Sequence, residues 1–236
     1  MEHTGVSLPL DLAFTDETGK PVRLGEYFTG KRPVVLQLGY YQCPMLCSLV
    51  SKGTAEAFKA VSLAPGKDYD LVFVSIDPNE TPALAAAKKQ AYLKETGLSG
   101  AGWHFLTGKQ ESIAPLAKEV GFNYRWIASA GQFSHPAAIM ICMPDGRVSR
   151  YLYGVRFDPQ TVRLSLVEAS AGKIGSTFDQ LYLTCFQYDG HQGKYAMAAL
   201  GVMRTGGVLM MIVVATVLLR LLRKELKLKA QAEGRA

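Results

Sequence analysis

Two apolar runs, each followed by a segment with the pattern of a helix, constrain the fold of this chain most. Residues 33–38 (PVVLQL) and 69–76 (YDLVFVSI) have the composition of strands buried on both faces. Residues 47–61 and 81–96 follow these runs and have helical periodicity. Strands that alternate with helices of this length predict an α/β protein with a layered sheet.

The rest of residues 9–173 continues this alternation of strands and helices. The sequence predicts a β-hairpin over 9–24, a short strand over 103–106, a helix over 110–120, a strand pair over 137–143 and 148–153, and a helix over 159–173. The turn Asp16-Glu17-Thr18-Gly19 indicates the hairpin, and the strand pair across Pro144-Asp145-Gly146 is expected to be antiparallel. A cysteine pair lies between the first buried strand and its helix. This order predicts a thioredoxin-like sheet with flanking helices and an N-terminal β-hairpin.

A C-terminal hydrophobic segment predicts a transmembrane helix. Residues 205–219 carry no charge, but alone they are shorter than the ~20 residues that cross a bilayer core. Extension back to Ala196 makes the segment long enough, with Arg204 placed where its side chain can snorkel to the interface. The alternative is a buried core helix. The predicted parts are an N-terminal extension and hairpin (1–32), the thioredoxin-like domain (33–174), a juxtamembrane connector (175–195), the membrane helix (196–222) and a basic tail (223–236).

The basic tail predicts the orientation of that helix. Six basic and two acidic residues lie between 220 and 236, so they account for most of the net charge of +6. Lys and Arg directly after a membrane segment favour a cytoplasmic C-terminus, with the main domain outside the cytoplasm. Residues 1–10 lack the pattern of a signal peptide, so either a leader was removed or export takes another route. A basic face for nucleic acid is not predicted.

Cys43 and Cys47 are the main candidates for chemistry. If Cys47 opens the helix over 47–61, Cys43 lies just before its N-terminus, where the helix dipole favours thiolates. Thiolate is the form that attacks disulfides and binds metals. Thioredoxins have two residues between their cysteines, whereas this pair has three, which lets both sulfurs chelate one metal ion.

His135 is the best-placed candidate for a further ligand. It directly precedes the strand over 137–143, and in a thioredoxin-like sheet the loop entering that strand faces the cysteine loop. Two thiolates and an imidazole form a donor set that copper accepts. A surface or core role for His135 is the alternative. His3 is terminal, His104 follows Trp103 in a short strand and is expected to be a packing residue, and His191 is expected to be solvated.

Several ordered motifs closely resemble the Sco/SenC family, above all its bacterial members with a C-terminal hydrophobic segment. These motifs are LQLGYYQCPMLCS, VSIDPNETPALAAAKKQAYL, WHFLTG, GQFSHPAAIMICMPDGRVSRYLYG and LYLTCFQYDGHQGKY. The resemblance implies a copper chaperone for the dinuclear copper site of cytochrome c oxidase. It places the ligands of one copper ion, Cu(I) or Cu(II), on Cys43, Cys47 and His135, and on Asp77 an acid that supports the ligands or the local structure. It also implies a copper donor protein and a single-pass protein of a bacterial inner membrane, with a periplasmic main domain.

The sequence departs from the family pattern at two positions. Ser48 stands where many relatives have proline, and little effect is expected. Gln187 stands where relatives often have histidine, which argues against a second metal site of Cys185, Gln187 and His191. Cys185 is therefore expected to be a packed thiol. Cys142 lies within an apolar strand and is expected to be a core residue.

Four functions are compatible with this pattern. The chain could deliver copper to the oxidase subunit by ligand exchange, in which case it need not be an enzyme. It could instead be a thiol-disulfide oxidoreductase that keeps the cysteines of that subunit reduced. A redox sensor that passes through a sulfenate is the third possibility. The fourth is a non-catalytic assembly factor that holds the subunit through its membrane helix and connector.

Overall fold

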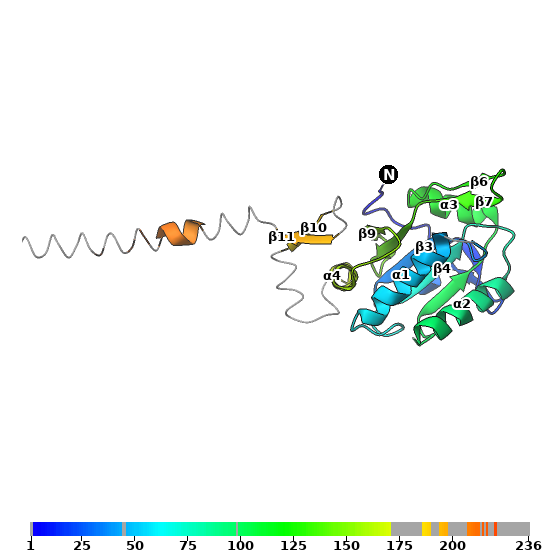
Figure 1. Ribbon diagram of the computed structural model, residues 1–236, viewed down its shortest axis with the longest axis horizontal. Coiled ribbons are helices and arrows are strands. Elements are labelled where there is room, and N and C mark those ends of the chain that lie inside the picture. The colour runs from blue at the N-terminus through cyan, green and yellow to red at the C-terminus, as the bar shows by residue number, and fades with distance from the viewer. Residues whose placement is uncertain are drawn as a thin grey trace, which may run out of the picture.

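The structure is a computed structural model of the 236-residue chain. It describes residues 2–43, 46–97, 99–170, 186–189, 194–197, 207–212, 214, 216 and 220. For 46–48, 51, 186–189 and 194–197 it describes the backbone alone. Figure 1 shows one α/β body formed by the described residues before 171.

A five-stranded mixed sheet forms the centre of this body, with the order β5-β4-β3-β8-β9. Its strands are β3 (Val34–Gly39), β4 (Asp70–Ser75), β5 (Trp103–Leu106), β8 (Ala138–Cys142) and β9 (Val148–Tyr153). β3, β4 and β5 are parallel, whereas β8 is antiparallel to both β3 and β9. The α/β class, the mixed sheet and the antiparallel pair at its end agree with the prediction.

Side chains of successive residues point to opposite faces of the sheet. In β3, Val34, Leu36 and Leu38 belong to one core cluster, and Val35 belongs to the other. Both faces are covered, which explains why β3 and β4 are predominantly apolar and are buried at every position.

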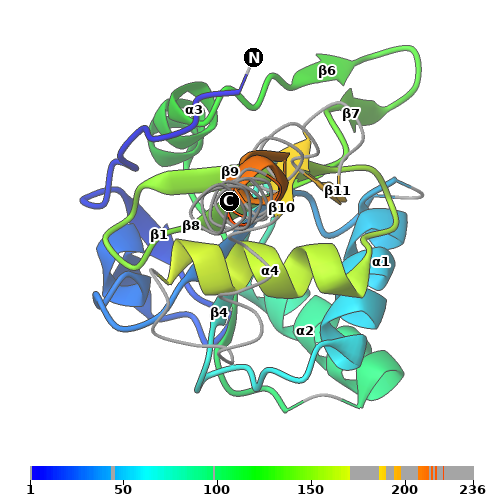
Figure 2. The same cartoon turned by 90° about the vertical axis from the view of Figure 1, so that its left-hand side faces the viewer.

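Three helices cover one face of the sheet. They are α1 (Leu46–Ala60), α2 (Pro82–Thr96) and α4 (Pro159–Ala169), which lie on the same side in Figure 2. The other face is covered by α3 (Gln110–Glu119) and by the N-terminal segment with β1 (Ala13–Thr15), β2 (Pro21–Arg23) and the 3-10 helix η1 (Leu24–Tyr27). The predicted N-terminal extension therefore packs into the same core as the domain that follows it.

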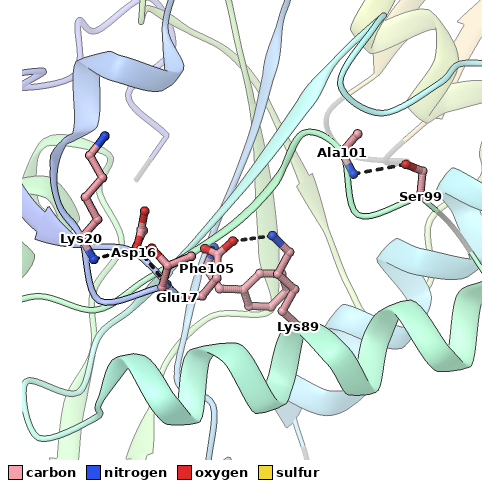
Figure 3. A network of polar contacts seen from close by, with 8 residues as sticks. Asp16, Glu17, Lys20, Lys89, Ser99, Ala101 and Phe105 are labelled. Carbon is pink, nitrogen blue, oxygen red and sulfur yellow. Dashed lines mark hydrogen bonds and ion pairs between the residues drawn. The ribbon is translucent and has the colours of Figure 1, made fainter.

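The N-terminal hairpin also covers the edge of the sheet at β5. The carboxylate of Glu17, in the turn between β1 and β2, accepts the backbone N–H of Phe105 at 3.0 Å and pairs with the ammonium of Lys89 on α2 (Figure 3). Thr15 and Thr107 exchange backbone hydrogen bonds at 2.8 Å. These contacts satisfy polar groups that an open edge strand would leave unpaired.

Two short antiparallel pairs were not predicted. One is β6 (Arg125–Ile127) with β7 (Gln132–Ser134), and the other is β10 (Phe186–Asp189) with β11 (Lys194–Met197). Ala196 lies in β11 and pairs with Gln187 of β10, so the membrane helix does not begin at residue 196 as predicted. Apolar content alone does not distinguish a strand from a helix, which explains this error. The helix predicted over 159–173 ends at Ala169 as α4.

The predicted membrane segment is described at residues 207–212, 214, 216 and 220, all of them helical. Within these and the other described residues, no helix combines the length and the apolar character needed to cross a bilayer. The remainder of 196–222 and the tail over 223–236 lie outside the described residues. The membrane helix stays a prediction.

Gly53 provides a test of how α1 packs against the segment between β9 and α4. A Cβ atom at this buried glycine would lie 2.0 Å from the carbonyl oxygen of Val155. In an exposed helix Gly→Ala stabilises by up to about 1 kcal/mol. Here we expect Gly53→Ala to lower the free energy of unfolding by about 1–3 kcal/mol, because backbone must move. Thermal and denaturant unfolding measure this change.

Glu56→Ala is the control, because Glu56 is an exposed residue of the same helix. We expect it to change the stability by no more than about 0.5 kcal/mol. A Gly53→Ala variant as stable as the wild type would contradict the close approach of Val155.

Candidate metal site

The cysteine loop joins β3 to α1. Cys43 lies in this loop and is buried, with 8% of its surface exposed. Cys47 is the second residue of α1, so the cysteine pair brackets the N-terminus of this helix as predicted. The side chain of Cys47 and residues 44 and 45 lie outside the described part of the chain.

The pairing of β3 with β8 brings His135 to the same end of the central strands as the cysteine loop. β3 runs into the cysteine loop, and β8, which starts three residues after His135, runs in the opposite direction with Gln37 paired to Ile139. The carboxyl end of β3 and the amino end of β8 therefore meet. Cys43 and His135 line one pocket of about 290 Å³. Its other lining residues are Tyr40, Leu49, Ile127, Gln132, Phe133 and Ser134.

Aromatic rings hold the imidazole of His135. The ring of Phe122 stacks on it at 5.6 Å and 28°, and the ring of Tyr40 meets it edge-on at 6.1 Å. Nδ1 lies 2.9 Å from the carbonyl oxygen of Pro136. Since a carbonyl oxygen only accepts, this contact assigns the proton to Nδ1 and the lone pair of the neutral ring to Nε2. Burial lowers the pKa of His135, partly offset by this hydrogen bond.

The hairpin of β6 and β7 forms an aromatic wall beside the pocket. The ring of Phe133 contacts those of Tyr40 at 5.4 Å and Trp126 at 5.0 Å. Leu49, which lines the pocket, is 48% exposed, and Trp126, which packs on the lining residue Phe133, is 53% exposed. Apolar surface next to the pocket is therefore open to solvent. This hairpin was not predicted from the sequence. Its signal was limited to three-residue strands around a turn that ends at Gly131.

Two acidic residues follow β4, and they have different contacts. Asp77 accepts hydrogen bonds from the backbone and side-chain nitrogens of Asn79, both at 2.9 Å, and so stabilises a local turn. Glu80 is the acid that reaches the cysteine loop, because its carboxylate accepts the backbone N–H groups of Tyr41 and Gln42. Asp77 was predicted from the sequence as a supporting residue, whereas Glu80 was not predicted.

Similarity to a known protein family extends over most of the α/β body. The family profile of SCO1/SenC matches residues 7–169, which include the cysteine loop, the β4–α2 loop and His135. The chain belongs to the SCO1/SenC family. None of the curated protein sequences matches it.

Solved structures share the fold of this SCO1/SenC chain. A proposed electron transfer protein from Aquifex aeolicus has a TM-score of 0.62 and 23% identity, covering 71% of this chain and 95% of its own. Bradyrhizobium japonicum ScoI with copper bound has a TM-score of 0.50 and 23% identity, with coverages of 68% and 96%. BsSco, a Sco family cytochrome c oxidase assembly protein with a disulfide switch, has a TM-score of 0.51 and 22% identity, with coverages of 72% and 98%.

The other cysteines and histidines of this SCO1/SenC protein lie away from the pocket or outside the described residues. Cys142 is wholly buried in β8, as predicted, and burial raises the pKa of its thiol well above the usual range. His104 packs against Tyr27 with ring centroids 4.5 Å apart, as expected for a packing residue. Nδ1 of His3 lies 2.7 Å from the carbonyl oxygen of Glu119. Cys185 and His191 are not among the described residues.

The described side chains supply part of the predicted donor set. Among them, no group of three or more Cys, His, Asp or Glu residues is placed to hold a metal ion, and the side chain of Cys47 is outside this set. The thiol of Cys43 and the imidazole of His135 are soft and borderline donors of the kind that suit copper. The assignment of Cys43, Cys47 and His135 as copper ligands, with Asp77 as a supporting acid, stays a prediction.

The pKa of His135 is a direct test of this pocket. In the metal-free protein we expect an NMR titration to give a pKa below the usual 6.5, because burial disfavours the imidazolium. The unfolded chain then binds more protons than the folded one, so stability should fall as the pH drops below about 6.5.

Phe122→Ala should raise the pKa of His135 back toward its usual value, because it removes the ring stacked on the imidazole. A pKa of His135 at or above 6.5 in the wild type would show that the ring is solvated.

Proposed function

We propose that this chain binds one copper ion through Cys43, Cys47 and His135 and delivers it to the dinuclear copper site of cytochrome c oxidase. Copper is the cargo in this function, not a resident cofactor. A copper donor protein would load the site, and the copper-site subunit of the oxidase would receive the ion. The main observation behind the proposal is that Cys43 and His135, far apart in the sequence, line the same pocket.

The state of each donor supports the proposal. A metal requires a neutral imidazole and deprotonated thiols. Burial lowers the pKa of His135 and so keeps its ring neutral at physiological pH. Cys47 lies at the start of α1, and helix N-termini favour thiolates. Family membership and the copper bound to ScoI of Bradyrhizobium japonicum point to the same metal.

Delivery would proceed by ligand exchange without a change in the oxidation state of copper. As thiolates and imidazoles of the acceptor bind Cu(I), they replace His135 and the two sulfurs one at a time. Each thiol of the acceptor releases a proton when it binds, and each sulfur released from Cys43 or Cys47 takes one up. The exposed apolar side chains of Leu49 and Trp126 would give the acceptor a surface to contact beside the pocket.

His135→Ala tests the copper site. We expect the reduced protein to bind one equivalent of copper. The affinity of the variant should fall by more than about 100-fold, because removal of a ligand should cost more than removal of an outer-shell partner, which costs about 10–100-fold. Copper titration against a chromophoric chelator measures the affinity. His3→Ala, which removes a histidine outside the pocket, should bind like the wild type. Equal affinities in wild type and His135→Ala would exclude the three-ligand site.

A thiol-disulfide oxidoreductase is the second candidate, favoured by the fold shared with BsSco, a protein with a disulfide switch. In this reaction Cys43 would attack a disulfide of the oxidase subunit and Cys47 would resolve the mixed disulfide, so that the subunit is reduced and this chain oxidised. The reaction does not need an imidazole. Dithiol exchange should therefore persist in His135→Ala while the copper affinity falls, and this separates the two functions.

We also propose that the C-terminal segment anchors the chain in a bacterial inner membrane, with the copper site in the periplasm. Met210→Lys with Ile212→Lys should release the chain from membranes into the soluble fraction, because each lysine costs about 2.5–3.5 kcal/mol at the centre of a membrane helix. Ala230→Lys with Ala232→Lys adds the same charge to the tail and should leave the chain in the membrane fraction. Alkaline extraction of isolated membranes distinguishes these outcomes. Release of the wild type by alkali would refute the anchor.

A further inference from the structure

Glu80 is a buried carboxylate at the start of α2, with 6% of its surface exposed. Oε1 accepts the backbone N–H of Gln42 at 2.8 Å, and Oε2 accepts the backbone N–H of Tyr41 at 2.8 Å and the hydroxyl of Ser75 at 2.6 Å. Within the described part of the chain, no ion pair involves Glu80. A buried charge is costly without partners, and these three hydrogen bonds therefore stabilise the carboxylate in its buried position.

Two of the three donors belong to the loop that leads to Cys43. Glu80 therefore joins the loop after β4 to the loop after β3 by a charge-assisted pair of hydrogen bonds. Tyr41 is held at its other end as well, because its hydroxyl lies 2.7 Å from the carbonyl oxygen of Leu106 and 3.1 Å from that of Phe73. The segment directly before Cys43 is thus fixed by its backbone and by a buried side chain.

We propose that Glu80 is a positioning residue of the copper site, which fixes the cysteine loop so that the Cys43 thiol lies across the pocket from His135. This inference rests on the proposed function. A metal site requires its ligands within a few tenths of an ångström of their bonding distances, so a loop that moves would lower the affinity and change the ligand field. The carboxylate also adds a negative charge close to a site that accepts a cation.

Charge and reach can be separated by two substitutions. Glu80→Gln keeps the length of the side chain, but its NH₂ group cannot accept, so one of the two backbone N–H groups loses its partner. Glu80→Asp keeps the charge but is one methylene too short to reach the N–H groups of both Tyr41 and Gln42. The proposal predicts that both variants disturb the site.

Glu17→Gln is the matched control, because Glu17 is a largely buried carboxylate that also accepts a backbone N–H, that of Phe105, at the β5 edge of the sheet. Glu17 does not line the pocket of Cys43 and His135. We expect all three variants to be less stable than the wild type. Only the two substitutions at Glu80 should alter the copper site.

Three measurements on the full chain test the proposal. In the metal-free protein, amide hydrogen exchange at Tyr41 and Gln42 should be at least about 10-fold faster in Glu80→Gln and Glu80→Asp than in Glu17→Gln. Copper affinity should fall by about 10–100-fold in the two Glu80 variants, the range seen for outer-shell partners of metal ligands. Their sulfur-to-copper charge-transfer bands with Cu(II) should shift, which a loss of stability alone would not cause.

Wild-type copper affinity and charge-transfer bands in both Glu80 variants would overturn the positioning role, whatever their stability. If only one variant folds, its affinity and bands decide in the same way. If the wild type itself fails to bind copper, the proposed function fails. The exchange rates of Tyr41 and Gln42 in the metal-free protein still show whether Glu80 holds the loop.

Discussion

The candidate site depends on the two different neighbours of β3. β4 lies parallel to it on one side, and β8 lies antiparallel on the other. The carboxyl ends of β3 and β4 and the amino end of β8 therefore form one edge of the sheet. The cysteine loop, the loop with Glu80 and the loop with His135 all begin or end there. Because β3 is buried at all six positions, its place in the sheet is strongly determined.

Burial then gives chemically similar groups different properties. Cys43 lies beyond the end of a strand and borders a pocket, whereas Cys142 lies inside β8 and is wholly enclosed. Burial raises the pKa of the Cys142 thiol and removes it from thiol chemistry. For His135 the same effect lowers the pKa and favours the neutral ring, the form that a metal would require. The position of each residue relative to its strand end thus decides whether its side chain is enclosed in the core or borders the pocket.

Most of the central sheet and its helices were predictable because their patterns are local. The buried runs of β3 and β4, the helices after them and the turn between β8 and β9 all follow from the order of apolar, polar and turn residues. The hairpin of β6 and β7 was missed, since its strands have three residues each and are mostly exposed. Glu80 was missed for another reason. An acidic residue before a helix has the pattern of a solvated first turn, and the loop residues whose N–H groups it accepts lie 39 and 38 residues earlier in the chain.

The sequence by itself determined the α/β order, the family and the identity of the candidate ligands, since these depend on residue types and short spacings. Only the tertiary structure decided that Cys43 and His135 share a pocket and that Phe122 and Tyr40 enclose the imidazole. It also decided that Glu80, not Asp77, accepts the backbone N–H groups of the cysteine loop. Those contacts join segments that are distant in the chain. They exist because strand pairing and burial of both faces of one sheet bring the loops together, and a local pattern carries no record of that pairing.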